Sequence, residues 1–324
     1  MTSTDLTFLV QQLRAIGEVT RARILALLTH GELSVGELAQ VLGQSQPRLS
    51  RHMKFLTAAG LVERLPEGAW VFYRLPADGR SRKLTDLLTA AIDPSDPMIR
   101  RDLERLAETR SARLAAAQQY FSRVAENWDA LRALHYSEGD IEQAVLDAAG
   151  PGPFDLVVDF GTGTGRMLAL FAERSRRAEG IDLSHQMLTV ARTNLAGLPN
   201  ASVRHGDATA SPYPDSSAGL VIIHQVLHFL DDPARALIEA ARVLKPSGQL
   251  VVVDFAPHRL EHLRSDHAHR RLGVSEVEFA RWAERAHLQV GSIRRFGAPA
   301  HGEGVAVTVW KAESRKSSGT ELAA

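Results

Sequence analysis

Residues 34–75 read SVGELAQVLGQSQPRLSRHMKFLTAAGLVERLPEGAWVFYRL, and this stretch decides the fold of the first third of the chain. Ser34 and Glu37 have the spacing of a capping box, in which each side chain bonds the other residue's backbone N–H. The short helix that they begin is expected to end at Gly43, because glycine readily adopts the left-handed conformation that ends many helices. A second helix is predicted over Ser45–Gly60, with the serine as its N-terminal cap.

A β-hairpin is predicted directly after this second helix. Residues 61–65 and 70–75 are strand-like, and residues 66–68, with a proline and a glycine, mark the turn between them. Residues 19–28 carry apolar side chains at helical spacing before the motif, and residues 82–92 read as one more helix after it. The first third of the chain is therefore expected to combine short helices with one hairpin.

The helix over Ser45–Gly60 divides its residues between an apolar face and a basic face. Leu49, Met53 and Leu56 fall on one side and are expected to pack inward. Arginine and glutamine on the other side can read bases in the major groove, and lysine and serine suit phosphates. An isolated basic helix face is usually only solvated, so it is the order of helices and hairpin that favours DNA binding. The candidate DNA-contacting residues are Ser45, Gln46, Arg48, Ser50, Arg51, His52 and Lys54 of the helix, and Arg64 and Arg74 of the hairpin.

A glycine-rich loop marks the start of a second domain. Residues 157–165 read VVDFGTGTG, so a strand-like run leads into three glycines at alternate positions. Glycine lets the backbone turn sharply and approach a ligand closely. The alternation of strand-like and helical segments around this loop predicts a doubly wound parallel sheet with an edge hairpin. The strand-like segments are 156–160, 178–182, 202–206, 220–223 and 249–254, followed by 289–296 and 305–311 for the hairpin.

Acidic residues follow the next two strands. Asp182 ends the second strand about 20 residues after the loop, where a carboxylate can accept hydrogen bonds from both hydroxyls of a ribose. Asp207 ends the third strand. The glycine spacing is GxGxG and not the GxGxxG of pyrophosphate binders, so a nicotinamide cofactor is the less favoured alternative.

The two predicted domains are separated by a Pro/Asp-rich break and a long helical stretch. Residues 93–97 read DPSDP, and apolar residues then recur every three or four positions over Met98–Trp128. This stretch either connects and dimerises the protein or packs on its own domain. The expected organisation is a DNA-binding domain over 1–95, a connecting helix and lid over 96–135, a nucleotide-binding domain over 136–312 and a disordered tail over 313–324.

The composition sets limits on location and chemistry. The 324 residues contain 38 Lys and Arg and 38 Asp and Glu, but a neutral total does not exclude a nucleic-acid partner, because a local basic face is what matters. There is no cysteine, which removes disulfides, thiolate metal sites and cysteine nucleophiles. No apolar run reaches the roughly 20 residues needed to span a bilayer, and the N-terminus lacks a signal-peptide pattern. A cytoplasmic protein without a membrane partner is expected.

Residues 34–75 closely resemble the winged helix-turn-helix of ArsR-type regulators. In that family the helix containing SQPRLSRHMKFL enters the major groove, the hairpin is the wing and the protein is a dimer. The resemblance implies double-stranded operator DNA as a partner and a homodimer as the assembly. Metal-sensing members use cysteines on the first helix of the motif, or His and Asp after the wing. The chain has no cysteine and residues 80–92 contain no histidine, so no metal site is expected and the signal must come from elsewhere.

The chain from about residue 120 to residue 311 resembles class I S-adenosylmethionine-dependent methyltransferases of the small-molecule type, with the motifs GDA, VLHFLDDP and RVLKPSGQL. The resemblance implies a Rossmann-like fold and S-adenosylmethionine or S-adenosylhomocysteine as cofactor. It places the glycine loop at the methionine part, Asp182 at the ribose and Asp207 at the adenine amino group. The implied cofactor-binding residues are Asp159, Gly161, Thr162, Gly163, Gly165, Asp182, Leu183, Met187, Asp207, Ala208, His224 and Gln225, the last two near the reactive sulfur.

No catalytic residue is assigned from the sequence. The chain lacks an Asn-Pro-Pro-Tyr-like motif, which argues against methylation of nucleobase amines, and it lacks the cysteines of arsenite methylation. Phe121 and Trp128 either cover the pocket or belong to a core. Four histidines after the fifth strand could bind a metal, serve a ligand as base, or simply be exposed or hydrogen-bonded. They are His258, His262, His267 and His269, and the first two are spaced to share one helix face.

Two functions fit these features. The combination resembles a group of ArsR-type regulators of the methionine cycle that respond to S-adenosylhomocysteine, which predicts a ligand-responsive repressor. The alternative is an active S-adenosylmethionine-dependent methyltransferase of small molecules, with an unidentified acceptor, that carries a DNA-binding domain. Each implied site residue serves cofactor binding in both cases, so the residues alone do not separate them.

Overall fold

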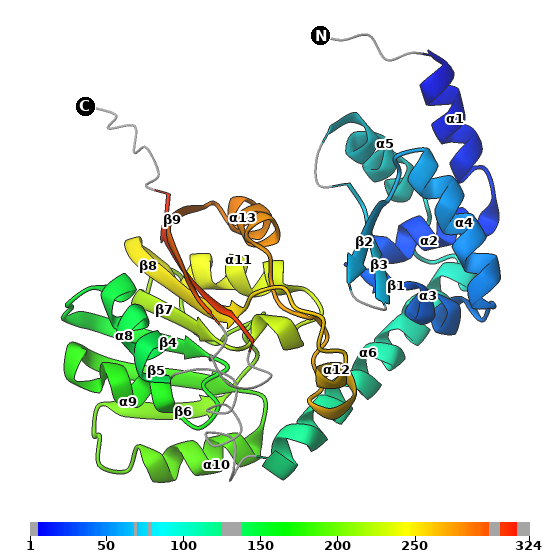
Figure 1. Cartoon of the computed structure of the whole chain (residues 1–324). Coiled ribbons are helices and arrows are strands. Elements are labelled where there is room, and N and C mark those ends of the chain that lie inside the picture. The colour runs from blue at the N-terminus through cyan, green and yellow to red at the C-terminus, as the bar shows by residue number, and fades with distance from the viewer. Residues whose placement is uncertain (1–5, 68–69, 77–78, 125–137, 298–304, 316–324) are drawn as a thin grey trace, which may run out of the picture. The chain divides into compact units, whose positions relative to one another are not determined.

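The computed structural model describes residues 6–67, 70–76, 79–124, 138–297 and 305–315 (Figure 1). By its internal contacts the chain divides into two compact units, Met1–Ala116 and Ala117–Ala324. The boundary falls inside helix α6 (Pro97–Val124), so a single helix contributes residues to both units. None of the helices in the described part of the chain is both long enough and apolar enough to cross a membrane.

The first unit is a winged helix-turn-helix. Its elements are α1 (Leu6–Ile16), α2 (Val19–Leu28), β1 (Leu33–Ser34), α3 (Val35–Leu42), α4 (Gln46–Ala58), β2 (Glu63–Glu67), β3 (Trp70–Arg74) and α5 (Gly79–Ala90). The sheet order is β1-β3-β2, with both pairs antiparallel. The sequence analysis missed the short strand β1, which pairs with β3.

The predicted helix signals are present in this unit. The Ser34 hydroxyl accepts the Glu37 N–H at 3.2 Å, and the Glu37 carboxylate accepts the Ser34 N–H at 2.8 Å, which confirms the capping box. Helix α3 ends at Gly43, whose φ of 65° lies in the left-handed region. Ser45 occupies the N-cap of α4 as predicted, but its side chain makes no capping hydrogen bond. Pro66 pairs with β3 in the sheet, so the turn begins later than predicted.

Helix α6 is fastened to the first unit along its N-terminal part. Leu106 is buried in the same core as the apolar face of α4. Both Asp102 carboxylate oxygens accept hydrogen bonds from the Arg23 guanidinium of α2, each at 2.6 Å. Arg105 donates to the backbone carbonyl of Val41 in α3 at 3.2 Å. These contacts explain why the boundary between the units falls within α6 and not before it.

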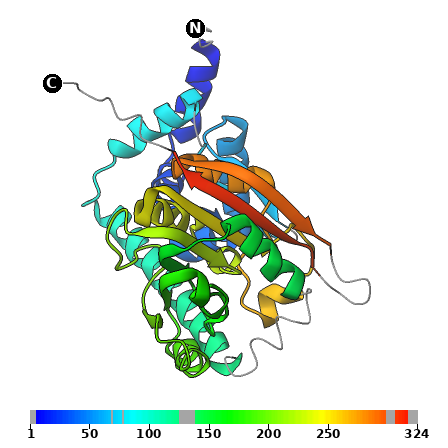
Figure 2. The same ribbon diagram turned by 90° about the vertical axis from the view of Figure 1, so that its left-hand side faces the viewer.

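The second unit is built on a seven-stranded, mostly parallel sheet, which confirms the predicted doubly wound fold. The strand order is β6-β5-β4-β7-β8-β10-β9. Strands β4 to β8 pair in parallel, and β10 lies antiparallel between β8 and β9, which are drawn in yellow and orange in Figure 1 and appear with red β10 in Figure 2. The strands are β4 (Phe154–Phe160), β5 (Ser175–Asp182), β6 (Ala201–His205), β7 (Ala218–His224), β8 (Leu244–Phe255), β9 (Leu288–Phe296) and β10 (Val307–Ser314).

Helices cover both faces of this sheet. Alternate residues of β4 point to opposite faces: Leu156, Val158 and Phe160 pack in the core with α11 and α13, whereas Val157 packs in the core with α8. Strand order reverses between β4 and β7, and ligands of open α/β sheets bind beyond the carboxyl ends of the strands at such a point. The helices are α8 (Glu138–Ala149), α9 (Arg166–Phe171), η2 (Ala172–Arg174), α10 (His185–Asn194), η3 (Leu227–Phe229), α11 (Pro233–Val243), α12 (His262–Asp266) and α13 (Glu276–Arg285).

Candidate DNA-binding surface and nucleotide-binding pocket

Helix α4 separates its buried and exposed residues as the sequence predicts. Leu49, Met53 and Leu56 are completely buried. On the other side the side chains of Gln46, Arg48, Arg51 and Lys54 are exposed. Arg48, Arg51 and Lys54, the three cations among them, form no ion pair with another described residue. A row of exposed cations that no carboxylate neutralises is suited to contact an anionic polymer.

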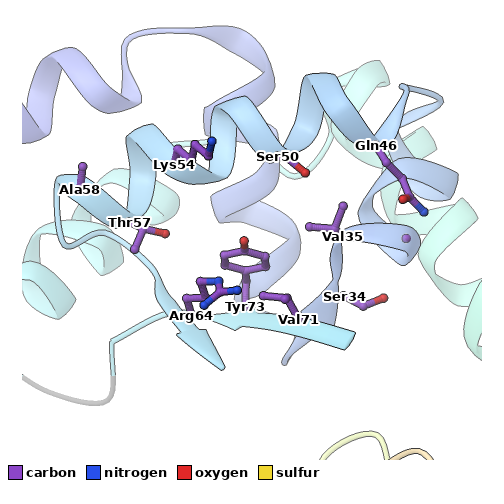
Figure 3. A pocket seen from close by; sticks show the side chains of 11 residues that line it. Ser34, Val35, Gln46, Ser50, Lys54, Thr57, Ala58, Arg64, Val71 and Tyr73 are labelled. Atoms are coloured by element: carbon purple, nitrogen blue, oxygen red, sulfur yellow. The ribbon is translucent and has the colours of Figure 1, made fainter. Parts of the chain in front are cut away.

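A groove of about 830 Å³ runs between α4 and the wing (Figure 3). Ser50 and Lys54 line it from the helix, and Arg64 and Tyr73 line it from the hairpin. In Figure 3 the Tyr73 ring stands on the sheet with its hydroxyl toward α4. The groove thus combines two cations with hydroxyl groups, which is a set of donors for a phosphate. Tyr73, which was not predicted as a site residue, is 7% exposed and belongs to the core of this unit while it also lines the groove.

Two of the predicted DNA-contacting side chains, those of Arg74 and His52, point toward carboxylates of the first unit. Arg74 is only 8% exposed, and its guanidinium is held by Glu63 at 2.7 Å and Glu32 at 3.3 Å. This arginine fastens the wing and does not face the groove. Glu63 lies directly opposite Arg74 in the antiparallel register, so the cross-strand pair could have been found once the hairpin was aligned. His52 is half-buried with Nδ1 at 3.4 Å from the Glu18 carboxylate, and burial lowers its pKa.

In the second unit the glycine loop begins where β4 ends. Gly161 has φ of 72°, and the N–H groups of Gly161 and Thr162 both donate to the Ile181 carbonyl, at 2.8 and 2.9 Å. A Cβ at Gly161 would lie 2.4 Å from the Val226 side chain, so only glycine fits there. The loop therefore lies directly against the segment that follows β7. The Thr162 hydroxyl is buried and has no hydrogen-bond partner among the described residues.

Asp182 is held at the end of β5 by backbone groups. One carboxylate oxygen accepts the Gly163 N–H at 2.9 Å, and the other accepts the Ser184 N–H at 2.8 Å. Burial raises the pKa of this carboxyl, and the two N–H donors act in the opposite direction. Each oxygen retains a further lone pair, so the group can still accept from two hydroxyls of a ligand.

The predicted adenine-side residues lie beyond the next strands. The Ser184 hydroxyl caps α10 by accepting the Met187 N–H at 3.3 Å, and Met187 is buried. Asp207 is half-buried, and Oδ1 accepts both the N–H and the hydroxyl of Thr209, at 2.7 and 2.8 Å. The other predicted residues are placed as follows: Asp159, Ala208 and His224 are buried, and Leu183 is half-buried. The sequence analysis missed the stacked rings of His185 and His205, with centroids 4.5 Å apart, next to the Asp182 strand end.

Gln225, which directly follows β7, is a buried polar residue without a partner. Its side chain is 6% exposed, yet neither its amide oxygen nor its amide nitrogen has a hydrogen-bond partner among the described residues. Its φ of 58° is unusual for a residue with a side chain. A buried polar group without a partner and a strained backbone both cost free energy and cluster at functional sites. The buried Thr162 hydroxyl, which lies against Gly180 of β5, is a second such group, and polar groups of this kind fit a polar nucleotide ligand.

The four histidines after β8 are not arranged as a metal site. No group of three or more His, Asp or Glu within the described ranges could hold a metal ion. His258 precedes α12 and His262 begins it, so the two do not share a helix face as the spacing suggested. Burial lowers the pKa of His258 to about 4. The Tyr120 hydroxyl lies 2.7 Å from Nδ1 of His267.

The sequence predicted Phe121 and Trp128 either as a cover for the pocket or as part of a core. Phe121 of α6 contacts the ring of Phe229 with centroids 4.8 Å apart, and Trp128 lies outside the described residues.

His228 and Asp254, which the sequence analysis did not single out, form a completely buried pair at 2.7 Å. His228 lies within the VLHFLDDP motif, so the motif itself was the available signal.

The fold defines a winged helix-turn-helix unit and a second unit built on a mostly parallel α/β sheet. Residues 18–64 match the family model of bacterial regulatory proteins of the arsR family, and residues 158–252 match a methyltransferase domain model. The chain thus carries one segment similar to the helix-turn-helix of arsR-family regulators and one segment similar to a methyltransferase domain.

Several known proteins are similar to parts of the chain. An uncharacterized 37.1 kDa protein in transposon TN4556 of Streptomyces fradiae is 38% identical over 114 residues, which cover 34% of this chain and 33% of that protein. The demethylmenaquinone methyltransferase of Renibacterium salmoninarum is 37% identical over 112 residues, covering 35% and 46%. That of Deinococcus radiodurans is 35% identical over 149 residues, covering 44% and 61%.

The chain therefore spans from one third to about three fifths of the length of these relatives. Among solved structures, the YcgJ protein of Bacillus subtilis has a TM-score of 0.49 at 20% identity. It covers 54% of this chain and 98% of its own.

Proposed function

We propose that the chain is a DNA-binding transcriptional regulator, acting as a repressor, whose methyltransferase domain binds S-adenosylhomocysteine or S-adenosylmethionine as its effector. The observation that carries the DNA-binding part is the surface of α4. Three exposed cations, Arg48, Arg51 and Lys54, stand opposite a fully buried apolar row, beside a groove that Arg64 also lines. Arginines so placed can hold guanine in the major groove, and the groove cations suit the phosphates beside it.

The pocket of the second unit supports the choice of effector. Asp182 supplies a carboxylate for a ribose, and Gln225 and Thr162 supply buried polar atoms that lack partners within the described residues. The chain contains no cysteine, so it lacks the thiolates through which many proteins of the arsR type sense metals. S-adenosylhomocysteine is the favoured effector, because a sensor of methylation load gains from reading the inhibitory product.

Exposed apolar side chains on α1 and α5 support the homodimer. Leu6, Phe8 and Leu13 of α1 are 72%, 39% and 45% exposed, and Leu87 of α5 is 71% exposed. Helices α1 and α5 are neighbours, since the Gln12 amide donates to the Ser81 hydroxyl at 2.9 Å. A second copy of the chain that packs on these two helices would present two α4 helices to DNA. Their spacing must be one helical turn of DNA, about 34–36 Å, for both to enter successive major grooves.

Substitution of the exposed arginines tests the regulator proposal. Arg48→Ala and Arg51→Ala are each expected to weaken binding to an operator, selected from a random duplex pool, by about 1–3 kcal/mol. Base preference should relax, because arginine carries the readout, while affinity for S-adenosylhomocysteine stays the same. Fluorescence anisotropy on the selected and a scrambled duplex measures the first effect, and calorimetry measures the second.

The matched control is Arg100→Ala, which removes an exposed arginine of α6 that pairs with Glu104 on its own helix at 3.7 Å. This variant should bind the operator like the wild type. Wild-type operator affinity in both α4 variants would refute the assignment of α4 as the recognition helix.

Methyl transfer to a small molecule is the second candidate function. The observation that favours it is the buried pair of His228, on η3 after β7, and Asp254, near the end of β8. A pure sensor has no need of a base at this position, whereas an enzyme that methylates a weakly acidic acceptor does. Sensing and turnover are compatible in one chain, since both begin with the same bound nucleotide.

A further inference from the structure

His228 is held rigidly by the groups around it. Its ring Nδ1 lies 2.7 Å from the Asp254 carboxylate, and its backbone N–H donates to the same carboxylate at 3.3 Å. Its backbone carbonyl accepts the N–H groups of Arg270 and Arg271, at 2.9 and 3.1 Å. Asp254 is itself fixed by the Phe255 N–H at 2.7 Å. The hydrogen bonds to the ring and those to the backbone of His228 therefore fix the orientation of the ring together.

The partner of Nδ1 determines the tautomer of the ring. A carboxylate accepts hydrogen bonds, so Nδ1 carries the hydrogen and Nε2 of the neutral ring presents a lone pair. Within the described residues, Nε2 of His228 takes no hydrogen bond. A carboxylate that orients a histidine and stabilises its protonated form is the arrangement by which proteins make histidine a general base.

The pair lies at the edge of the sheet where the nucleotide pocket is built. His224 ends β7, and Gln225 donates its N–H to Val253 of β8 at 2.8 Å, directly before Asp254. Val226 touches the glycine loop at Gly161. His228 follows on η3. It therefore lies on the segment that contacts both the glycine loop and the ends of β7 and β8.

Aromatic and imidazole rings surround His228. The ring of Phe229 lies 4.0 Å away and that of His269 4.2 Å away, with Phe255 at 5.1 Å. Phe121 of α6 stacks edge-on against Phe229. Burial raises the pKa of the Tyr120 hydroxyl to about 12 and lowers that of His258 to about 4, so both groups stay neutral near pH 7. Aromatic rings pack readily against another planar ring, so an aromatic acceptor is favoured over a charged one.

We propose that His228, oriented by Asp254, is the general base of a methyl-transfer site whose acceptor is a planar aromatic alcohol. The inference rests on the proposed binding of S-adenosylmethionine. Nε2 of His228 takes the proton of the acceptor hydroxyl, and the acceptor oxygen bonds to the methyl carbon. The bond between that carbon and the sulfonium sulfur breaks, and its electron pair stays on the sulfur. The products are an aryl methyl ether, S-adenosylhomocysteine and a protonated His228, which Asp254 stabilises until the proton passes to water.

A phenol with a visible anion tests this base directly. The full chain is saturated with S-adenosylhomocysteine and titrated with 4-nitrophenol, at a pH where the free phenol is protonated. The wild type is expected to bind the phenol saturably and to show the absorbance of the phenolate, because the proton has moved to His228. His228→Asn keeps a donor for Asp254 but removes the base, and it should reduce the phenolate signal at least tenfold.

The control is His287→Asn, an exposed histidine with φ of 54°, a conformation that asparagine accepts readily. It should behave like the wild type, and calorimetry should show equal affinity for S-adenosylhomocysteine in all three proteins. If the wild type binds S-adenosylhomocysteine but gives no saturable phenolate signal, or if His228→Asn gives the same signal, the base assignment is wrong. If the wild type does not bind S-adenosylhomocysteine, it is the proposed effector that fails.

Discussion

Asp182 combines a buried carboxylate with two backbone donors, and its remaining lone pairs are the proposed contacts to the ribose. A charge-assisted hydrogen bond contributes roughly 1.5–3 kcal/mol. Asp182→Ala is therefore expected to lower the affinity for S-adenosylhomocysteine at least tenfold in calorimetry, with an unchanged circular dichroism spectrum. Asp155→Ala, which removes an exposed carboxylate on β4 that pairs with Lys245, should bind like the wild type. Unchanged binding by Asp182→Ala would mean that the glycine loop serves another ligand.

His258 predicts a pH dependence of stability. Its pKa is about 4 in the folded chain against 6.5 when unfolded, because burial disfavours the charged ring. Between these values the unfolded chain binds a proton that the folded chain does not, so the free energy of unfolding decreases as the pH falls below 6.5. The ring is half-buried, so we expect about 1–2 kcal/mol of this loss between pH 7 and pH 5.

Urea unfolding of the wild type and of His258→Gln at pH 7 and pH 5 measures this contribution. The variant should lose less stability on acidification than the wild type, by that amount. His287→Gln, which changes an exposed histidine, should keep the wild-type difference. Equal pH dependence in all three proteins would contradict the assignment.

At the scale of single residues, the sequence predicts only those whose role follows from their neighbours along the chain. Asp182 and the glycines could be proposed because Asp182 ends one predicted strand and the glycines directly follow another. Arg74 was assigned to DNA, but its partners Glu32 and Glu63 depend on how the hairpin folds back. The pairing of His228 with Asp254 joins the segment after β7 to the end of β8, so it required the sheet order.

At the scale of elements, α6 is fastened to α2 by a largely buried ion pair. Asp102 is 2% exposed and receives both Arg23 hydrogen bonds at 2.6 Å. Asp102→Ala leaves the Arg23 cation without its carboxylate, so the free energy of unfolding of the first unit should fall by about 2–4 kcal/mol. Urea unfolding measures this loss. Glu104→Ala, which breaks an exposed pair on the same helix, should cost less than about 0.5 kcal/mol. Similar losses in the two variants would contradict the proposed docking of α6.

Elements with strong local signals could be predicted well, and those defined by distant pairing could not. Helix α3 is fixed by its capping box and Gly43, and α4 by its apolar period and the flanking turn residues. The five parallel strands follow from buried apolar runs that alternate with helices. The two-residue strand β1 exists only through its pairing with β3, and the position of β10 between β8 and β9 depends on long-range hydrogen bonds.

At the scale of the whole molecule, α6 is the element that both units share. Its N-terminal part bonds α2 and α3, and Arg113 pairs with Glu37 of the α3 capping box. Within the second unit its C-terminal part carries Tyr120, bonded to His267, and Phe121, against Phe229. A ligand that orders the surroundings of Tyr120 and Phe121 is thus expected to bias the helix that supports the helix-turn-helix. This coupling is our account of how a nucleotide would release DNA.

The central claim is that one ligand controls the affinity for the other, and such coupling must be reciprocal. The most direct measurement is a titration of S-adenosylhomocysteine into a preformed complex of the protein with its selected operator, followed by fluorescence anisotropy. Typical couplings of about 1–3 kcal/mol predict at least a fivefold loss of operator affinity at saturation. The operator should weaken S-adenosylhomocysteine binding by the same factor, and Asp182→Ala should bind operator normally without responding. Saturable binding of S-adenosylhomocysteine with no change in operator affinity would contradict the account.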